Sequence, residues 1–192
     1  MKLFGTTVLG VASLALLTAC GGSTTDAVSY ASLSTSSAAM QSQYTDANGE
    51  LLGGVAPAAT VDILAAADAT YTGYVSGTVS GGEMVADLTI DANFFTNSAN
   101  ASATNFVHET NGAYTGTLSG TGVILPTAPL GDDQVTTVLD GSLEYGGASL
   151  TTSIGLGGSF VSSSGDPVGA IAGTADGLVG TDLMTGVFAV EK

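Results

Sequence analysis

Cys20 is the only cysteine in the chain, and the residues around it give its thiol a specific chemistry. Leu17-Thr18-Ala19 lies directly before it, and Gly21-Gly22 lies directly after it. Thr18 and Ala19 are small enough to enter a peptidase cleft. The pattern predicts cleavage by a peptidase between Ala19 and Cys20.

The residues before Cys20 have the organisation of a secretory signal. Lys2 provides a positive charge, and Val8 to Leu17 forms an apolar run rich in Leu, Val and Ala. Because this run is far shorter than the ~20 residues needed to span a bilayer, residues 1–19 are predicted to be a cleaved signal peptide and not a membrane helix. The alternative is an ordinary signal peptide followed by an unmodified thiol.

Residues 17–20 resemble the processing site of bacterial lipoproteins, whose mature cysteine carries a diacylglyceryl thioether and usually an N-acyl chain. This resemblance implies lipidation of Cys20 by chains such as palmitate, and more than one acyl chain gives stable anchoring. Gly21 follows the cysteine where an Asp would mark retention in the inner membrane. By resemblance to enterobacterial sorting rules, this implies the outer membrane of a Gram-negative bacterium.

The chain is strongly acidic, with 17 Asp and Glu residues against two lysines and a formal net charge of −15. Lys192 is the only cation beyond the predicted leader. Such a surface repels phosphate backbones, so nucleic acid is not an expected partner. It also disfavours adsorption to anionic lipid, so the acyl chains must supply the membrane attachment. Two interpretations stay open, namely attraction of a basic partner and colloidal solubility in a saline exterior.

The residue types that catalysis requires are sparse. His108 is the only histidine, no Gly-x-Ser-x-Gly elbow occurs, and we expect His108 to lie on the surface at a strand end. Asp132-Asp133 is expected to be a solvated loop tip, since no calcium-binding repeat accompanies it. Asp87 and Asp91 are about 13 Å apart on a predicted strand, too far for a glycosidase pair. The sequence therefore predicts no catalytic residue, no metal site, no cofactor and no enzymatic activity.

Two regions follow the predicted leader. Residues 20–69 include two stretches low in bulky apolar side chains, Gly21 to Thr25 and Ser32 to Ser37. They predict an acylated N-terminus followed by a flexible, low-complexity linker. Val61 to Ala69 is compatible with a short helix or with an extended lead-in. Residues 70–192 are predicted to form one domain.

From Tyr71 onward, apolar and polar residues alternate with a period of two. In Met84 to Phe94 the even positions are apolar, and Val135 to Tyr145 and Leu150 to Phe160 alternate in the same way. This pattern is typical of antiparallel strands with one buried face and one wet face. Turn residues separate eight predicted strands, at 71–79, 84–95, 99–108, 113–124, 134–145, 149–161, 168–178 and 183–191.

The spacing of these strands favours a barrel or a sandwich. Glycines at inward positions, among them Gly120, Gly141 and Gly158, fit a small barrel whose strands coil strongly around a filled interior. We therefore predict an all-β fold, a single eight-stranded antiparallel up-and-down β-barrel preceded by a flexible tether. An outer-membrane barrel is disfavoured because the strands lack aromatic girdles and the polar face carries Asp and Glu.

Four segments of residues 70–192 resemble the barrel domain of transferrin-binding protein B. They are Ala86 to Phe94, Tyr114 to Gly120, Gly157-Gly158-Ser159-Phe160 and Met184 to Lys192. The resemblance implies an eight-stranded barrel held at the cell surface by lipid. Members of that family bind host iron or haem carriers or complement regulators. The handle domain that makes much of the transferrin contact has no counterpart here, so the resemblance does not imply transferrin binding.

Two function classes stay open. The first is a surface-displayed binding module, a monomer whose loops Pro126 to Asp133 and Ser162 to Pro167 contact a protein or small-molecule ligand. The ligand could be an iron or haem carrier or another protein. The second is a structural envelope lipoprotein without a specific ligand. Because His108 is the one strong candidate for an axial ligand, we expect the purified protein to show no haem absorbance.

Overall fold

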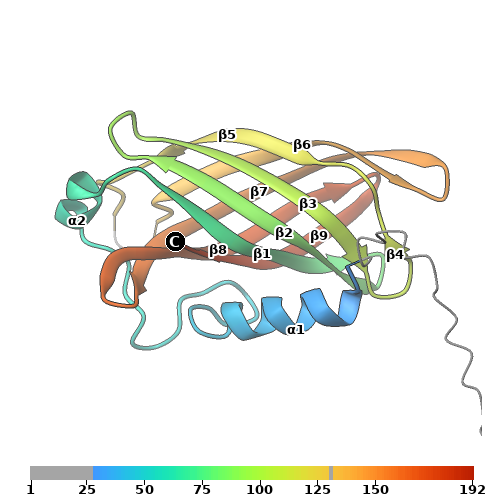
Figure 1. The fold of residues 1–192 in the computed structure, drawn as a ribbon, viewed down its shortest axis with the longest axis horizontal. Coiled ribbons are helices and arrows are strands. Elements are labelled where there is room, and N and C mark those ends of the chain that lie inside the picture. Colours follow the sequence, from blue (N-terminus) through green and yellow to red (C-terminus); the bar gives the residue numbers. More distant parts are fainter. Residues whose placement is uncertain (1–27, 130–131) are drawn as a thin grey trace, which may run out of the picture.

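The computed structural model describes residues 28–129 and 132–192, and these form a closed antiparallel β-barrel with two helices outside the wall (Figure 1). The predicted leader and the predicted lipidation site Cys20 lie outside the described residues. Within the described ranges, no helix is both long enough and apolar enough to cross a membrane.

Consecutive long strands are neighbours throughout the barrel, and β1 pairs with the last strand to close it. Eight long strands make the wall, while β4 is a two-residue strand beside β3. The strands are β1 (Ala69–Val79), β2 (Gly82–Asn93), β3 (Ser98–His108), β4 (Gly112–Ala113), β5 (Leu118–Ile124), β6 (Val135–Tyr145), β7 (Ala148–Ser163), β8 (Asp166–Val179) and β9 (Asp182–Glu191). The eight-stranded up-and-down barrel predicted from the alternation is therefore confirmed.

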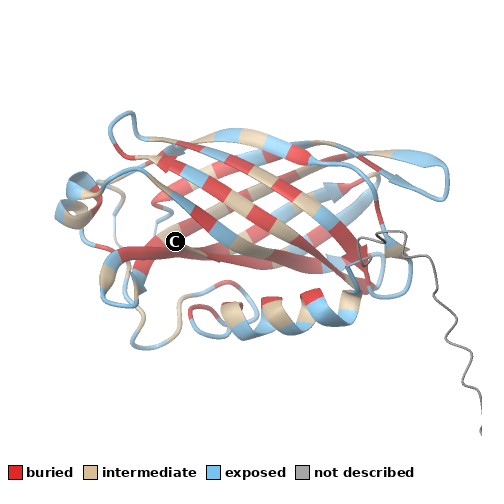
Figure 2. Ribbon diagram, in the orientation of Figure 1, coloured by how far each residue is buried: buried red, intermediate tan, exposed pale blue. Residues whose placement is uncertain are grey.

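The alternation in sequence becomes an alternation between the inside and the outside of the barrel. Figure 2 shows buried and exposed residues taking turns along the strands. Leu88, Leu139 and Phe160 belong to a single buried cluster inside the wall. The outward positions of β2 carry Asp87, Thr89 and Asp91 instead. Burying the apolar face is the main force that closes the sheet.

Facing glycines let the strands approach closely inside the barrel. Gly158 pairs with Gly173, and a Cβ added at Gly173 would lie 2.5 Å from the Gly158 Cα. A Cβ added at Gly158 would lie 2.9 Å from Cζ of Phe188, so the missing side chain is what admits that ring. Gly77 and Gly186 form a second such pair between β1 and β9. Larger residues at these positions would force the wall outward.

The flexible linker predicted over Ser32 to Ser37 is wrong, because these residues lie within helix α1 (Tyr30–Gln41). The Ser29 side chain caps the helix by accepting a hydrogen bond from the Ser32 N–H. Leu33, Ser37 and Gln41 are buried at i, i+4 and i+8, which is one helix face. Only one of these three residues is apolar, so the helical period is not visible in the hydrophobic pattern.

Helix α1 packs on the outside of β1, β2 and β9 (Figure 1). Leu33 contacts Val85 and Val107 there, and farther along the chain Tyr44 lies over small residues such as Ala172 and Ala189. A buried glutamine joins the two layers, since the Gln41 Nε2 donates to the Val187 carbonyl at 3.2 Å and its Oε1 accepts from the Ser76 hydroxyl at 3.2 Å. Small outward side chains on the strands thus make room for the helix.

The short helix α2 (Thr60–Ala65) closes one end of the barrel, which resolves the open choice for this part of the sequence in favour of a helix over 60–65. Ile63 is fully buried and belongs to the barrel core. The segment before it is fixed by Gln134, whose Nε2 donates to the Ala58 carbonyl at 2.8 Å and whose Oε1 accepts from the Phe160 N–H at 3.1 Å. The Ala58 N–H in turn donates to the Phe160 carbonyl at 2.7 Å.

Candidate binding surface at one end of the barrel

The up-and-down topology sorts the connections between strands into two sets. The β2–β3, β5–β6 and β7–β8 connections lie at one end of the barrel together with α2, and we call this the Phe95 end. The β1–β2, β6–β7 and β8–β9 turns lie at the other end together with β4, and we call this the His108 end. Both predicted contact loops, Pro126 to Asp133 and Ser162 to Pro167, belong to the Phe95 end, although residues 130–131 lie outside the described structure.

The interior of the barrel is filled by side chains. The core cluster extends from Ile63 of α2 at one end to Met184 near the β8–β9 turn at the other. At the Phe95 end its aromatic members pack together, with the ring of Phe160 centred 6.0 Å from that of Tyr71 and 5.2 Å from that of Phe94. An eight-stranded barrel is just wide enough for such a packed core. Recognition of a ligand must therefore use the outside of the wall or an end.

Phe95 is the most exposed large apolar side chain of the described residues, with 92% of its surface open to solvent. Its neighbour Phe94 is 6% exposed and packs in the core. The two rings point to opposite sides because the alternation of β2 continues into the turn. The alternation of the strand therefore indicates that Phe95 is exposed, although the predicted contact surface included only the loops Pro126 to Asp133 and Ser162 to Pro167.

The turn that carries Phe95 is held by several hydrogen bonds. Asp68 accepts from the Phe94 N–H at 2.9 Å and from the Asn93 side-chain amide at 2.9 Å. The Asn93 Oδ1 accepts from the Thr96 N–H at 2.7 Å and from its hydroxyl at 2.6 Å. The Ile124 N–H donates to the Asn97 carbonyl at 2.9 Å, which joins this turn to the β5–β6 connection. Phe95 is therefore exposed on an ordered support.

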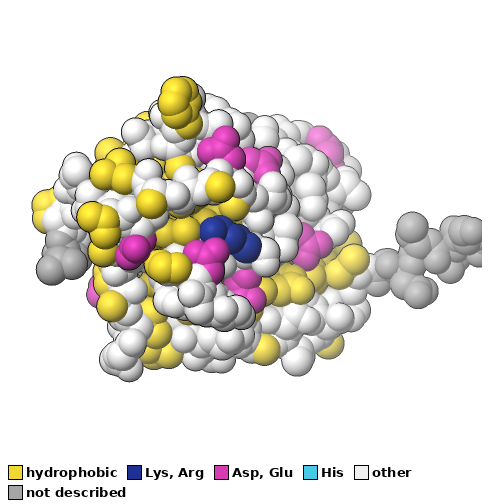
Figure 3. Space-filling model, turned by 60° about the vertical axis from the view of Figure 1, so that its left-hand side comes forward, with side chains coloured by type: hydrophobic (Ala, Val, Ile, Leu, Met, Phe, Trp, Pro, Cys, Tyr) yellow, Lys and Arg dark blue, Asp and Glu magenta, His cyan; other side chains and the backbone are white. Residues whose placement is uncertain are grey.

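Other exposed apolar side chains surround this end of the barrel. Val61 and Leu64 on α2 are 71% and 62% exposed, and Leu125 in the β5–β6 connection is 44% exposed. Figure 3 shows hydrophobic side chains gathered over this end, with acidic groups between them and one cation near the centre. Soluble proteins leave single apolar residues exposed without consequence, but a group that shares one surface marks an interaction site.

The cation at this end is Lys192, and it is neutralised. Its Nζ lies 2.8 Å from the Asp166 carboxylate and 5.7 Å from the centre of the Tyr71 ring. The hydrogen bond from Lys192 and a second one from the Val168 N–H lower the pKa of Asp166 below its ordinary value. Burial, assisted by the Asp166 charge, raises the pKa of Tyr71, whose hydroxyl donates to the Val168 carbonyl at 2.7 Å.

The Asp132-Asp133 pair also lies at the Phe95 end, at the start of β6. Both residues are exposed, as expected for a loop tip. The Asp133 carboxylate nevertheless lies against the bare backbone of Gly157, and this partial loss of water, followed by the negative charge of Asp132, raises the pKa of Asp133. A hollow of about 310 Å³ near Asp133 is bordered by Glu50, Leu51 and the bare backbone of Gly157. Over the described residues, no group of three or more His, Cys, Asp or Glu side chains is arranged to hold a metal ion.

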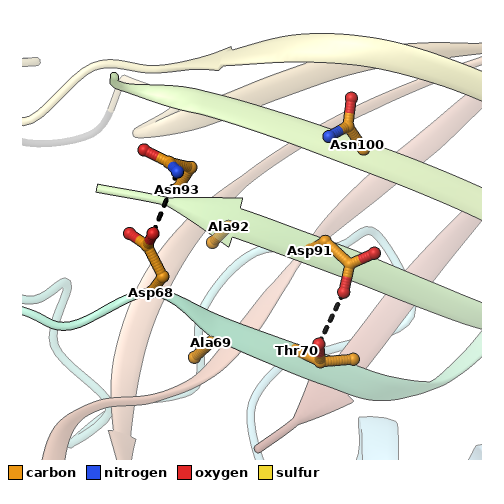
Figure 4. A pocket seen from close by; sticks show the side chains of 7 residues that line it. All are labelled: Asp68, Ala69, Thr70, Asp91, Ala92, Asn93 and Asn100. Carbon is orange, nitrogen blue, oxygen red and sulfur yellow. Dashed lines mark hydrogen bonds between the residues drawn. The ribbon is translucent and has the colours of Figure 1, made fainter. Parts of the chain in front are cut away.

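Asp87 and Asp91, which the sequence places on one strand, lie on the outer face of β2 and hydrogen-bond to different neighbours. Asp91 accepts from the Thr70 hydroxyl at 2.5 Å, and Asp87 accepts from the Asn105 amide at 2.7 Å. Figure 4 shows the hollow beside Asp91, a space of about 350 Å³ bordered by Asp68, Ala69, Thr70, Asp91, Ala92, Asn93 and Asn100. Its polar groups serve to join β1, β2 and the turn that follows.

The expectation of a surface position for His108 is wrong, because His108 is 1% exposed. Its Nε2 lies 2.9 Å from the Val79 carbonyl, and its Nδ1 accepts from the Thr110 and Asn111 N–H groups at 3.2 and 3.3 Å. Since Nδ1 accepts from these N–H groups, Nε2 is the nitrogen that donates to the Val79 carbonyl. Sequence reasoning placed His108 at a strand end correctly but could not show that its strand faces it inward.

Comparison with protein families, curated proteins and solved structures found no match for this chain. The fold and the surfaces described above therefore carry the functional argument.

Proposed function

We propose that this chain is a lipid-anchored binding module of the outer membrane, tethered through Cys20, and that its Phe95 end contacts a protein partner at the cell surface. The observation that carries the proposal is the 92% exposure of Phe95 on a turn held by its own hydrogen bonds. Aromatic side chains on rigid supports dominate the energetics of protein interfaces because little entropy is lost when they bind.

The direction of the chain supports this orientation. Helix α1 begins next to Glu83, which accepts hydrogen bonds from Tyr30 and Ser34, and Glu83 lies beside the β1–β2 turn. The first described residues therefore enter at the His108 end. Cys20 precedes Val28 by eight residues, which reach at most about 29 Å when extended. A barrel held from this end presents Phe95 away from the bilayer.

The resemblance to transferrin-binding protein B supports the same kind of protein, a lipid-tethered barrel that displays a binding surface. An iron carrier, a haem carrier and another host or environmental protein are all compatible ligand classes. The competing proposal is a structural envelope lipoprotein. It leaves the exposed Phe95, Val61 and Leu64 without a role, so we prefer the binding module.

Site-specific photo-crosslinking on intact cells tests the proposal. A photoreactive phenylalanine analogue replaces Phe95 in one strain and Leu183 in a second strain. The second strain is the control, because Leu183 is also exposed (69%) but lies at the opposite end of the barrel. We expect a discrete crosslinked protein from position 95 and none from position 183. Equal labelling at both positions, or none at position 95, would contradict a binding role for the Phe95 end.

Two further measurements test the anchor and the display. Mass spectrometry of the mature N-terminus is expected to show acyl chains on Cys20, and an unmodified cysteine would refute the tether. Protease added to intact cells should remove the barrel if it stands on the surface, whereas a periplasmic barrel would be protected.

A further inference from the structure

Resting on this proposed function, we infer the chemistry of the partner, which is a protein surface with an apolar pocket for Phe95 bordered by Lys and Arg side chains. Three properties of the Phe95 end lead to this inference. They are the rigid aromatic anchor, the carboxylates at the same end and the absence, among the described residues, of an unpaired cation to balance them.

Phe95 provides the apolar part of the contact. Its turn is joined by the Phe94–Asp68 hydrogen bond to the segment after α2, which exposes Val61 and Leu64. The Asn97–Ile124 hydrogen bond joins the same turn to the segment that exposes Leu125. These four side chains belong to one end of the barrel but to three separate segments. A matching surface must therefore be a folded face or an amphipathic helix with apolar groups to cover them.

The carboxylates at the same end set the charge of the partner. Acidic side chains come from two other segments of this end, with Asp62 and Asp68 in and after α2 and Asp132 and Asp133 before β6. Lys192 is the one cation among the described residues, and it is paired with Asp166. It therefore does not offset the negative charge of the other carboxylates at this end. Basic groups around the partner's pocket would gain attraction from these carboxylates and from the net charge of −15.

The same charges argue against two other occupants. A second copy of the chain would bring an equally acidic end against this one, and like charges across an interface oppose association. A phospholipid surface needs Lys or Arg to hold its phosphates, but the mature chain carries only the paired Lys192. Both occupants are nevertheless outcomes of the experiment below.

The test uses three synthetic helical peptides as probes against the full mature chain. One carries Leu on one face and Lys on the other, the second has Glu in place of Lys, and the third has Ala in place of Leu. Fluorescence anisotropy is measured for the wild type, for Phe95→Ser and for Leu183→Ser. We expect the Leu–Lys peptide to bind the wild type with the highest affinity of the three. Phe95→Ser should lower this affinity at least tenfold, and Leu183→Ser should lower it less than twofold. The affinity should also fall as the salt concentration rises.

Several results would overturn the inference. They are equal binding of the Glu peptide, equal binding of the Ala–Lys peptide, or an affinity for the Leu–Lys peptide that Phe95→Ser leaves unchanged. Association with phosphatidylcholine vesicles, or dimerisation of the chain, that disappears with Phe95→Ser would assign the surface to lipid or to a second copy.

The crosslinking experiment on cells separates failure of this inference from failure of the proposed function. A partner captured at position 95 whose contact face is acidic would retain the binding module and refute the basic partner. If position 95 captures no protein, the binding function itself fails, whatever the peptides do.

Discussion

Side chains close the hydrophobic core at both ends of the barrel, but the two ends expose different side chains to solvent. At the His108 end, a buried imidazole satisfies the backbone of the β3–β4 turn, and Tyr114 stacks on Tyr145 with ring centres 4.6 Å apart. At the Phe95 end, Ile63 of α2 closes the core, and a second apolar layer stands outside it. Because the side chains of the outer layer are largely exposed, we expect them to add little to closure, which would separate a stabilising role from a binding role within one end.

The largest expected effect distinguishes the two apolar layers through adjacent residues of α2. Ile63→Ala should lower the free energy of unfolding by about 3 kcal/mol, because a fully buried side chain leaves a cavity in the core. Leu64→Ala, at a position 62% exposed, should change it by less than about 0.5 kcal/mol. Urea unfolding of both variants checks this pair. Equal losses would mean that the outer layer is part of the fold.

At the opposite end, His108→Leu should cost about 2 kcal/mol. The substitution leaves the Thr110 and Asn111 N–H groups without their acceptor in a buried site. Glu109→Gln is the control, since Glu109 is an exposed neighbour on the same turn. Urea unfolding is again the measurement, and a His108→Leu variant as stable as the wild type would show that these hydrogen bonds contribute nothing.

The support of Phe95 is expected to contribute less to stability but more to binding. Asp68→Ala removes the acceptor of the Phe94 N–H and should cost about 1 kcal/mol. It should also reduce crosslinking from position 95, because the turn loses its fixed geometry. Asp91→Ala, which affects only the bond to Thr70 on the outer wall, should leave crosslinking unchanged. Equal crosslinking in the Asp68→Ala strain would show that rigidity is not required.

The smallest effects concern pH, and two carboxyls of the Phe95 end should respond in opposite directions. Folding raises the pKa of Asp133, so its contribution to stability rises as pH falls through the folded pKa, and Asp133→Asn should stabilise the chain slightly at neutral pH. Folding lowers the pKa of Asp166, so its contribution is present above the unfolded pKa and is lost as pH falls through the folded pKa. Asp166→Asn should therefore destabilise slightly at neutral pH.

Thermal unfolding between pH 3 and 7 compares these two variants with the wild type. Both groups are partly exposed, so each effect should stay within about 0.5 kcal/mol. Shifts of the same sign for the two variants would contradict the opposite environments assigned to them.

The barrel was predictable from sequence because each strand buries one face, so residues such as Leu88 and Leu139 record the pleat directly. Helix α1 was not predictable in this way. Its buried face is Leu33, Ser37 and Gln41, and it packs on residues contributed by β1, β2 and β9. These partners are far apart in sequence, and no local period shows that a Ser-rich segment will meet them.

The candidate site was predictable in part. The alternation of β2 places Phe94 inside and Phe95 outside, so a Phe-Phe pair at a strand end indicates an exposed ring. What the sequence could not show is the hydrogen bond from the Phe94 N–H to Asp68, 26 positions earlier, or that α2 lies at the same end. Similarly, the register of β2 and β3 shifts at a bulge between Val85 and Asp87, and beyond this bulge His108 pairs with Met84. The sequence does not show this shift, on which the burial of His108 depends.

Oxidative footprinting of Phe95 tests the central claim most directly. Hydroxyl radicals label exposed side chains, so Phe95 and Leu183 should both be modified in the purified mature chain, where they are 92% and 69% exposed. On intact cells in growth medium, the account predicts that modification of Phe95 falls several-fold while modification of Leu183 is unchanged. Equal labelling of Phe95 on cells and in the purified chain would contradict the claim that this end of the barrel is occupied by a partner.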